Sequence, residues 1–117
     1  MFKDILKSTV EGLPGALGAI FADWEGESVE HFFAGPEDEI KLLGAHQGIL
    51  LNLVKEAAAG AGHGAVKCMM LTTDKARVVV QPIKDGYFLV LLLTRHCNSG
   101  LALRAASSAA GVLSGEI

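Results

Sequence analysis

The sequence has little of what several large classes of protein depend on. Its only two cysteines, Cys68 and Cys97, match neither a zinc knuckle nor a C-x-x-C redox pair. The four histidines are scattered without the spacing of metal ligands. The net charge is −3, and no basic run alternates with aromatic residues, which excludes the usual footprint of a nucleic-acid-binding protein. We therefore expect no metal, no cofactor and no nucleic acid among its ligands.

Long apolar runs are also missing. Lys3, Asp4 and Lys7 interrupt the N-terminus before an apolar stretch can develop, so no signal peptide is expected. The longest apolar run, residues 87–93, is much shorter than the about 20 residues that cross a bilayer. Because no disulfide pattern is present either, we expect a protein of the reducing cytoplasm.

Apolar residues are nevertheless abundant. They make up 50% of the 117 residues, and the mean hydropathy is +0.39. A chain of this length suits a single domain, residues 1–117, which buries roughly two-thirds of its unfolded-chain surface without disulfides or metals. So high an apolar content in so small a chain favours an oligomer, in which further apolar surface is covered.

The periodicity of the apolar residues predicts the order helix, two strands, helix, three strands, helix. We expect helices over 2–12, 36–59 and 98–113, and strands over 17–22, 28–33, 65–72, 77–83 and 87–94. The last two strands barely alternate, which indicates burial on both faces of the sheet. The predicted fold class is therefore α+β, an α/β sandwich in which helices cover both faces of a mainly antiparallel five-stranded sheet.

Three local details complete this prediction. Gly18 lies inside a strand, where a close neighbour or a bulge would explain the missing side chain. Asn98 is expected to cap the last helix, whose inner stripe is predicted to be Leu101, Ala105, Ala109 and Val112. Trp24 lies in a tight turn, either as an exposed interaction anchor or folded back over the first helix.

The middle helix carries more apolar surface than one helix of a monomer needs. One predicted stripe contains Ile40, Leu43, Leu50, Leu51, Val54 and Ala58, and Leu42, Ile49 and Leu53 widen it. The apolar arc then covers roughly two-thirds of the circumference, whereas a surface helix needs about one-third. Only a wedge of Lys41, Gly44, Gly48, Asn52 and Lys55 is expected to face water. The surplus predicts a second protein surface.

Several motifs together resemble the Roadblock / dynein light-chain-seven family. They are Leu13-Pro14-Gly15-Ala16-Leu17-Gly18-Ala19-Ile20 before Asp23-x-x-Gly26, Asp85-Gly86-Tyr87-Phe88-Leu89-Val90, and Asn98-Ser99-Gly100-Leu101-Ala102-Leu103. The resemblance covers nearly the whole chain and implies a Roadblock-like fold, related to profilin and longin domains. Bacterial members of the family include partners of Ras-like small GTPases, among them the gliding-motility regulator that stimulates GTP hydrolysis.

The resemblance implies a homodimer or heterodimer whose sheets join through the third strand and whose central helices lie side by side. For self-association we predict Leu42, His46, Ile49, Leu53, Val66, Cys68 and Met69. For the GTPase-binding surface we predict Lys41, Gly44, Gly48, Asn52 and Lys55. The expected function is a non-enzymatic dimeric scaffold that binds a Ras-like small GTPase and modulates its cycle.

Two other functions remain open. Antiparallel sheets flanked by helices also occur in PAS-like and GAF-like sensors of small ligands, although the last two strands offer only aliphatic side chains to a pocket. His96 and Cys97 could supply the base and nucleophile of an enzyme, but consecutive side chains rarely meet in these roles. The glycines of residues 60–64 follow a helix and precede a strand, so we expect them to end the helix rather than to hold a phosphate.

Overall fold

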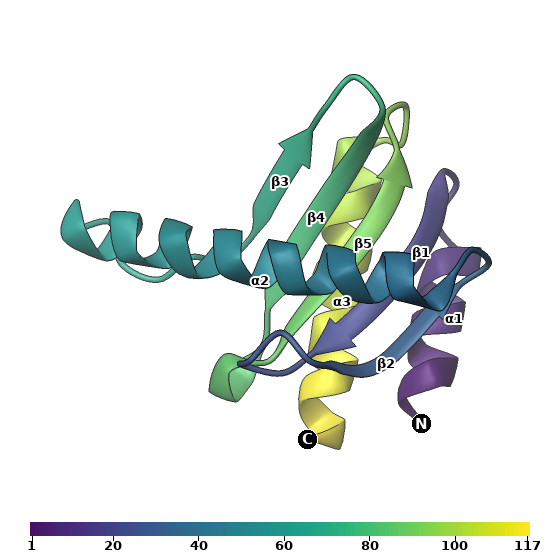
Figure 1. Cartoon of the computed structure of the whole chain (residues 1–117), viewed down its shortest axis with the longest axis horizontal. Helices are drawn as coiled ribbons and strands as arrows, with labels where there is room; N and C mark the ends of the chain where they lie inside the picture. Colours follow the sequence, from purple (N-terminus) through teal and green to yellow (C-terminus); the bar gives the residue numbers. More distant parts are fainter.

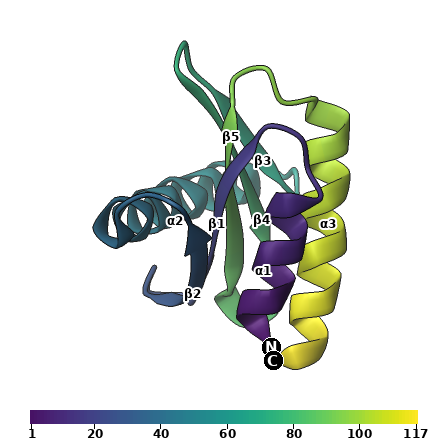
Figure 2. The same ribbon diagram turned by 90° about the vertical axis from the view of Figure 1, so that its right-hand side faces the viewer.

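A five-stranded antiparallel sheet separates three helices into two layers (Figure 1, Figure 2). This computed structural model describes residues 1–117. Its elements are α1 (Phe2–Glu11), β1 (Ala16–Ala22), β2 (Ser28–Phe33), α2 (Glu37–Gly60), β3 (Met69–Thr72), β4 (Ala76–Pro82), the 3₁₀ turn η1 (Lys84–Gly86), β5 (Phe88–Thr94) and α3 (Ser99–Glu116). The predicted element order and the α+β class are confirmed.

The strands lie in the order β2-β1-β5-β4-β3, and every neighbouring pair is antiparallel. β5 is therefore central, while β2 and β3 form the two edges. Leu89, Val90 and Leu91 in β5 are fully buried, as are Val79 and Val80 in β4. Helices on both faces explain this burial, as the apolar runs without alternation predicted.

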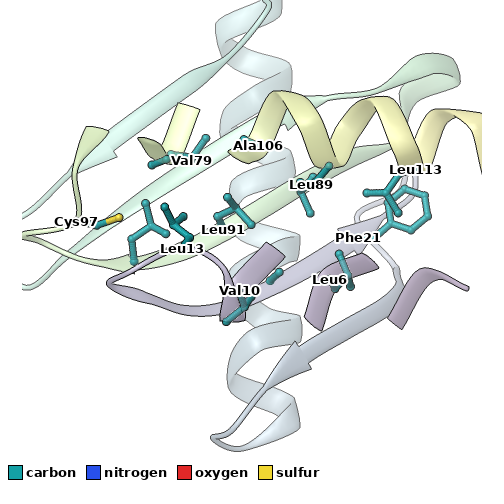
Figure 3. Close-up of a cluster of buried hydrophobic side chains, with 14 residues drawn as sticks. Leu6, Val10, Leu13, Phe21, Val79, Leu89, Leu91, Cys97, Ala106 and Leu113 are labelled. Atoms are coloured by element: carbon teal, nitrogen blue, oxygen red, sulfur yellow. The ribbon is translucent and has the colours of Figure 1, made fainter. Parts of the chain in front are cut away.

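Each face of the sheet has its own hydrophobic cluster. α1 and α3 lie side by side on one face, where 14 buried residues pack together (Figure 2, Figure 3). The labelled members in Figure 3 include Leu6 and Val10 from α1, Phe21 from β1, and Leu113 from α3. α2 covers the other face, where Ile40 and Leu51 pack on a smaller cluster of sheet residues. None of the helices is long and apolar enough to cross a membrane.

Gly18 is required by its surroundings in β1. A Cβ at this position would lie 2.7 Å from Cδ1 of Phe33 in β2. The pairing of β1 with β5 also shifts between Ala16 and Gly18. Both the close neighbour and the bulge suggested by the sequence are present, because the missing side chain allows β2 to pack at this point.

β3 is shorter than predicted. It spans Met69–Thr72, whereas the apolar pattern predicted a strand over 65–72. The preceding residues, 63–68, form no ladder with β4. Instead, the side-chain amide of Gln81 donates a hydrogen bond to the carbonyl oxygen of Lys67 at 2.9 Å. A side chain therefore holds this segment beside the sheet, which apolar periodicity could not predict.

The predicted inner stripe of α3 is right for Ala109 but wrong for Leu101 and Val112, whereas Asn98 caps the helix as predicted by accepting a hydrogen bond from the Leu101 amide at 3.0 Å. Leu101 and Val112 are 45% and 52% exposed. The buried face is Ala102, Ala106, Ala109, Ala110 and Leu113. Its alanines let the helix backbone approach the sheet, so the face with the smaller side chains turns inward. Val112 instead lines a hollow of about 500 Å³ between α1 and α3.

Candidate functional site: the α2 surface and the β3 edge

α2 crosses the sheet and continues beyond its edge. Its first half packs on β1, β2 and β5, and in Figure 1 its C-terminal part extends past β3 with no strand beneath it. The residues buried against the sheet are Ile40, Gly44, Gln47, Gly48 and Leu51. The stretch of helix beyond Leu51 therefore contributes no fully buried side chain. We call it the overhang, residues 52–60.

Gly44 and Gly48 face the sheet, so the prediction that they belong to the solvent-exposed wedge is wrong. A Cβ on Gly44 would lie 2.9 Å from Cδ1 of Ile20, and one on Gly48 would lie 2.9 Å from Cζ of Phe88. The two glycines let the helix backbone rest on these side chains. They lie on the same helical face as Ile40 and Leu51. The 3.6-residue period predicts this position if glycine is treated as a residue that can pack against the sheet.

The apolar flank of α2 is exposed, as the sequence predicted. We define it by six residues: Leu42, His46, Ile49, Leu50, Leu53 and Val54. Leu42, Ile49 and Leu53 are 57%, 61% and 56% exposed. Each lies two positions from a buried residue, which places it about 200° around the helix and pointing away from the sheet. Leu50 and Val54, predicted as core, are also 40% and 37% exposed.

The overhang explains much of the unexpected exposure of Leu50 and Val54, because residues near and beyond the β3 edge have less of the sheet to pack on. Beside the apolar flank, Leu43 and His46 line a hollow of about 260 Å³ together with Phe33 and Leu92. This hollow lies over the part of the sheet that α2 leaves uncovered. A monomer thus presents a continuous apolar surface made of one helix flank and an adjacent strip of sheet.

The opposite flank of α2 is polar. Lys41 and Asn52 are exposed and Lys55 is half-buried, in agreement with the remaining part of the predicted wedge. Lys41 Nζ lies 2.8 Å from Glu37 Oε1. The hydrogen bond and the opposite charge of Lys41 lower the pKa of the Glu37 carboxyl, and the same interaction with Glu37 raises the pKa of the Lys41 ammonium group. His31 Nε2 lies 4.0 Å from the same Glu37 oxygen. The polar flank therefore has an ion pair at its N-terminal end.

β3 is an open edge with apolar side chains. Met69 packs against the α2-side cluster, whereas Cys68 and Met70 pack against the cluster beneath α1 and α3. Leu71 is 41% exposed. Val66, which precedes the strand, is half-buried on the α2 side. The predicted self-association residues thus lie on the apolar flank and along this edge, which approach each other where α2 crosses β3 (Figure 1).

Cys97 and His96 do not form a catalytic pair. The Cys97 thiol is buried and donates a hydrogen bond to the carbonyl oxygen of Pro14 at 3.3 Å. His96 is exposed, and its Nε2 accepts a hydrogen bond from Arg95 Nε at 3.2 Å. Burial raises the pKa of the Cys97 thiol above its usual value of 9.0. Cys97 therefore has neither the thiolate character nor the access of a nucleophile.

The cysteines are consequently expected to react slowly in the folded protein. Burial also raises the pKa of the Cys68 thiol, so both cysteines carry less thiolate at neutral pH than a free cysteine. Alkylation by iodoacetamide at a pH of about 7.5, followed by mass spectrometry, should be slower for both than in urea, and slowest for Cys97. The rates should rise as the pH is increased above about 9. Faster alkylation of Cys97 in the folded state than in urea would contradict this description of the thiol.

The remaining candidate groups have structural roles. The Asp23 carboxylate accepts hydrogen bonds from the amides of Glu25 and Glu27 at 2.9 and 3.1 Å, which fixes the β1–β2 turn. Trp24 is 59% exposed and packs edge-on against Tyr87, with 5.5 Å between ring centroids, rather than over α1. No three of the His, Cys, Asp and Glu side chains gather where they could hold a metal ion. The glycines of 60–64 end α2, as predicted.

Comparison with protein-family models gave no match, and a search of curated proteins gave none either. Solved structures do match. A Roadblock/LC7 domain from Streptomyces avermitilis has a TM-score of 0.86 at 16% identity, covering 93% of this chain and 91% of that chain. The gliding protein MglB from Thermus thermophilus has a TM-score of 0.85 at 16% identity, covering 97% of this chain and 85% of that chain.

MglC from Myxococcus xanthus is also similar, with a TM-score of 0.71 at 24% identity over 99% of this chain and 98% of that chain. At these identities the likeness concerns the fold. The three structures share it with this chain over nearly its whole length. The chain has the Roadblock/LC7 fold, as its sequence motifs suggested.

Proposed function

We propose that this chain is a dimeric regulatory platform that binds a Ras-like small GTPase and modulates its GTPase cycle without catalysing a reaction itself. The observation that carries the proposal is the exposed apolar flank of α2 beside the open edge of β3. A second copy is the partner that would cover both. The Roadblock/LC7 fold adds support, because the family that the sequence resembles includes GTPase regulators and because the similar solved structures include MglB and MglC.

The proposed platform acts by contact rather than by chemistry. Ras-like GTPases carry their own catalytic glutamine and switch loops, and a bound protein can alter hydrolysis by ordering these loops. The chain would contribute a rigid binding surface supported by its β-sheet. We assign the GTPase contact to the polar flank of α2, namely Lys41, Asn52 and Lys55, because self-association would cover the apolar flank.

Binding to Ras-like GTPases of the source organism tests this proposal. Each GTPase is loaded with GDP or a non-hydrolysable GTP analogue and titrated with the chain in a calorimeter, and GTP hydrolysis is measured in parallel. We expect one GTPase to bind, with the two nucleotide states differing by about tenfold or more in affinity, equivalent to about 1.4 kcal/mol.

Lys55→Glu should weaken this binding by about tenfold, since a charge on the contact surface is reversed. Lys7→Glu is the matched control, because Lys7 is an exposed lysine on α1, on the other side of the sheet. Absence of binding to every Ras-like GTPase tested would contradict the proposed function. If Lys55→Glu and Lys7→Glu weaken GTPase binding equally, the assignment of the GTPase contact to the polar flank is wrong.

A further inference from the structure

A hollow of about 710 Å³ lies between the overhang of α2 and the C-terminal end of β4. After α2 the chain turns back along the overhang to reach β3 (Figure 1). Gly62 and Gly64 allow this reversal, because their φ angles of +75° and +83° lie in the left-handed region. The wall of the hollow therefore comes from three parts of the chain, namely the overhang, residues 64–67 and residues 81–83.

Two residues at the end of β4 keep this hollow open. Pro82 has no amide hydrogen to donate to a longer ladder between β3 and β4. The side-chain amide of Gln81 donates instead to the carbonyl oxygens of Lys67 and Pro82, at 2.9 and 3.4 Å. The segment before β3 thus runs beside the sheet without pairing with it. As a result, no hydrogen bond to another protein group is donated by the amides of Gly64, Ala65, Val66 and Lys67.

The only charged side chains in the wall are two lysines. Lys55 comes from the overhang and Lys67 from the segment before β3. Neither lysine belongs to an ion pair, and no acidic residue lines the hollow, although the net charge of the chain is −3. Two ammonium groups and a run of unpaired amides are hydrogen-bond donors that lack an acceptor. This combination is typical of a site for an anion, and a phosphate group can accept from both kinds of donor.

The C-terminal end of α2 opposes an anion, because the helix dipole places about half a negative elementary charge there. In this chain the carbonyl oxygens of Ala57, Ala58 and Ala59 accept hydrogen bonds from the amides of residues 61–63, at 2.8 to 3.1 Å. These bonds satisfy the carbonyl groups that would otherwise face a ligand. The two lysines carry two full positive charges, so they determine the sign of the potential in the hollow.

The remaining wall of the hollow is mostly apolar. Its apolar residues are Ala59, Val66, Pro82 and Ile83. The volume lies within the range of about 300–1,000 Å³ that is usual for pockets that bind small molecules. Inorganic phosphate alone would leave the apolar wall in contact with water. A ligand that suits both parts of the wall carries a phosphate group on an apolar or planar body.

We propose that this hollow binds a small, soluble phosphate monoester. Lys55, Lys67 and the free amides of residues 64–67 surround the phosphate group, and the apolar wall covers the organic body. Because the lysines line a hollow beneath the overhang, the ligand is a soluble molecule rather than a headgroup in a bilayer. The site goes beyond the proposed function and requires neither a GTPase nor a second copy. A bound phosphate would link the overhang to the segment before β3, and would thereby stabilise the C-terminal half of α2.

Phenyl phosphate is the probe for this proposal, since it carries a phosphate monoester on a planar apolar ring. Calorimetry on the full chain should give a dissociation constant of about 1 mM or below. Inorganic phosphate should bind about fivefold more weakly or worse, because it covers none of the apolar wall. In ¹H–¹⁵N correlation spectra, the largest shifts on adding phenyl phosphate should be those of the amides of residues 64–67.

Lys67→Gln should weaken the binding of phenyl phosphate by about tenfold, since it removes one of the two charges at the site. Lys67 is the better choice for a single substitution, because Lys55 also belongs to the polar flank. The double variant Lys55→Gln, Lys67→Gln should lose measurable binding. Lys75→Gln is the matched control, because it removes the same charge from an exposed position in the turn between β3 and β4. It should leave binding unchanged.

Three results would overturn the proposal. They are no detectable binding of phenyl phosphate, equal weakening by Lys67→Gln and Lys75→Gln, and amide shifts confined to residues outside the hollow. Vesicles of phosphatidylcholine with phosphatidic acid, whose headgroup is also a phosphate monoester, test the source of the phosphate. The chain should not sediment with them, and sedimentation that depends on Lys67, without binding of phenyl phosphate, would contradict a soluble ligand. No GTPase enters these measurements, so their outcome is independent of the proposed function.

Discussion

Ile49→Asp is expected to convert the dimer into a monomer. Ile49 is 61% exposed on the apolar flank, so the isolated chain tolerates a carboxylate there. In the dimer, each copy would bring an unpaired charge into an apolar contact, and the two-fold axis doubles the cost. Unpaired buried charges cost about 3–5 kcal/mol, which corresponds to an increase in the dimer dissociation constant of at least about 100-fold. Sedimentation equilibrium over a range of concentrations measures this constant.

Val112→Asp is the matched control. Val112 is a β-branched residue, 52% exposed, on α3 and thus on the far side of the sheet. The same type of substitution there should leave the dimer constant unchanged within about threefold, since sites so far apart act independently. If Ile49→Asp dimerises as tightly as the unmodified chain, the apolar flank is not the self-association surface. If both variants dissociate, general destabilisation rather than a local contact is responsible.

Gly44→Leu is expected to destabilise the protein and displace α2 from the sheet. A Cβ alone would lie 2.9 Å from Cδ1 of Ile20, which is fully buried, and leucine adds three more carbons. Overpacking of this kind costs about 1–3 kcal/mol. A lower free energy of unfolding in urea, with an unchanged slope, would be the direct measurement. Because the helix carries the apolar flank, dimerisation should weaken as well.

Gly111→Leu provides the comparison at an open site. Gly111 lies in α3, and nothing lies within 4 Å of a Cβ built there. Replacing a helical glycine by leucine at such a position should raise stability by up to about 1 kcal/mol through helix propensity. If the free energy of unfolding falls for Gly44→Leu and rises for Gly111→Leu, the effect of packing is separated from that of helix propensity. If Gly44→Leu is as stable as the unmodified chain, α2 does not rest on Ile20 in the way described.

The element order and the sheet could be predicted because they depend on local patterns. The runs in β4 and β5 lack alternation, and this follows directly from burial on both faces. The Asn98 cap and the end of α2 at Gly60 depend on the chemistry of one or two residues. The apolar surplus of α2 could also be counted from the sequence, since it requires only the helical period.

The parts that could not be predicted depend on what lies beside an element. Gly44 and Gly48 resembled exposed positions because glycine carries no apolar signal, yet their lack of a side chain is what brings α2 onto the sheet. Leu50 and Val54 resembled core residues because periodicity contains no information about where a sheet ends. In α3 the cause is different: the helix buries a face made of four alanines and Leu113, whereas the larger Leu101 and Val112 lie outside it.

The mass of the unmodified chain in solution tests the central claim most directly. Light scattering on the protein eluting from a size-exclusion column, at micromolar concentration, should give twice the 12.2 kDa of one chain. That result is expected because the apolar flank of α2 and the edge of β3 are exposed in a single copy. A mass of one chain across that concentration range would show that water alone covers this surface, and it would contradict the account.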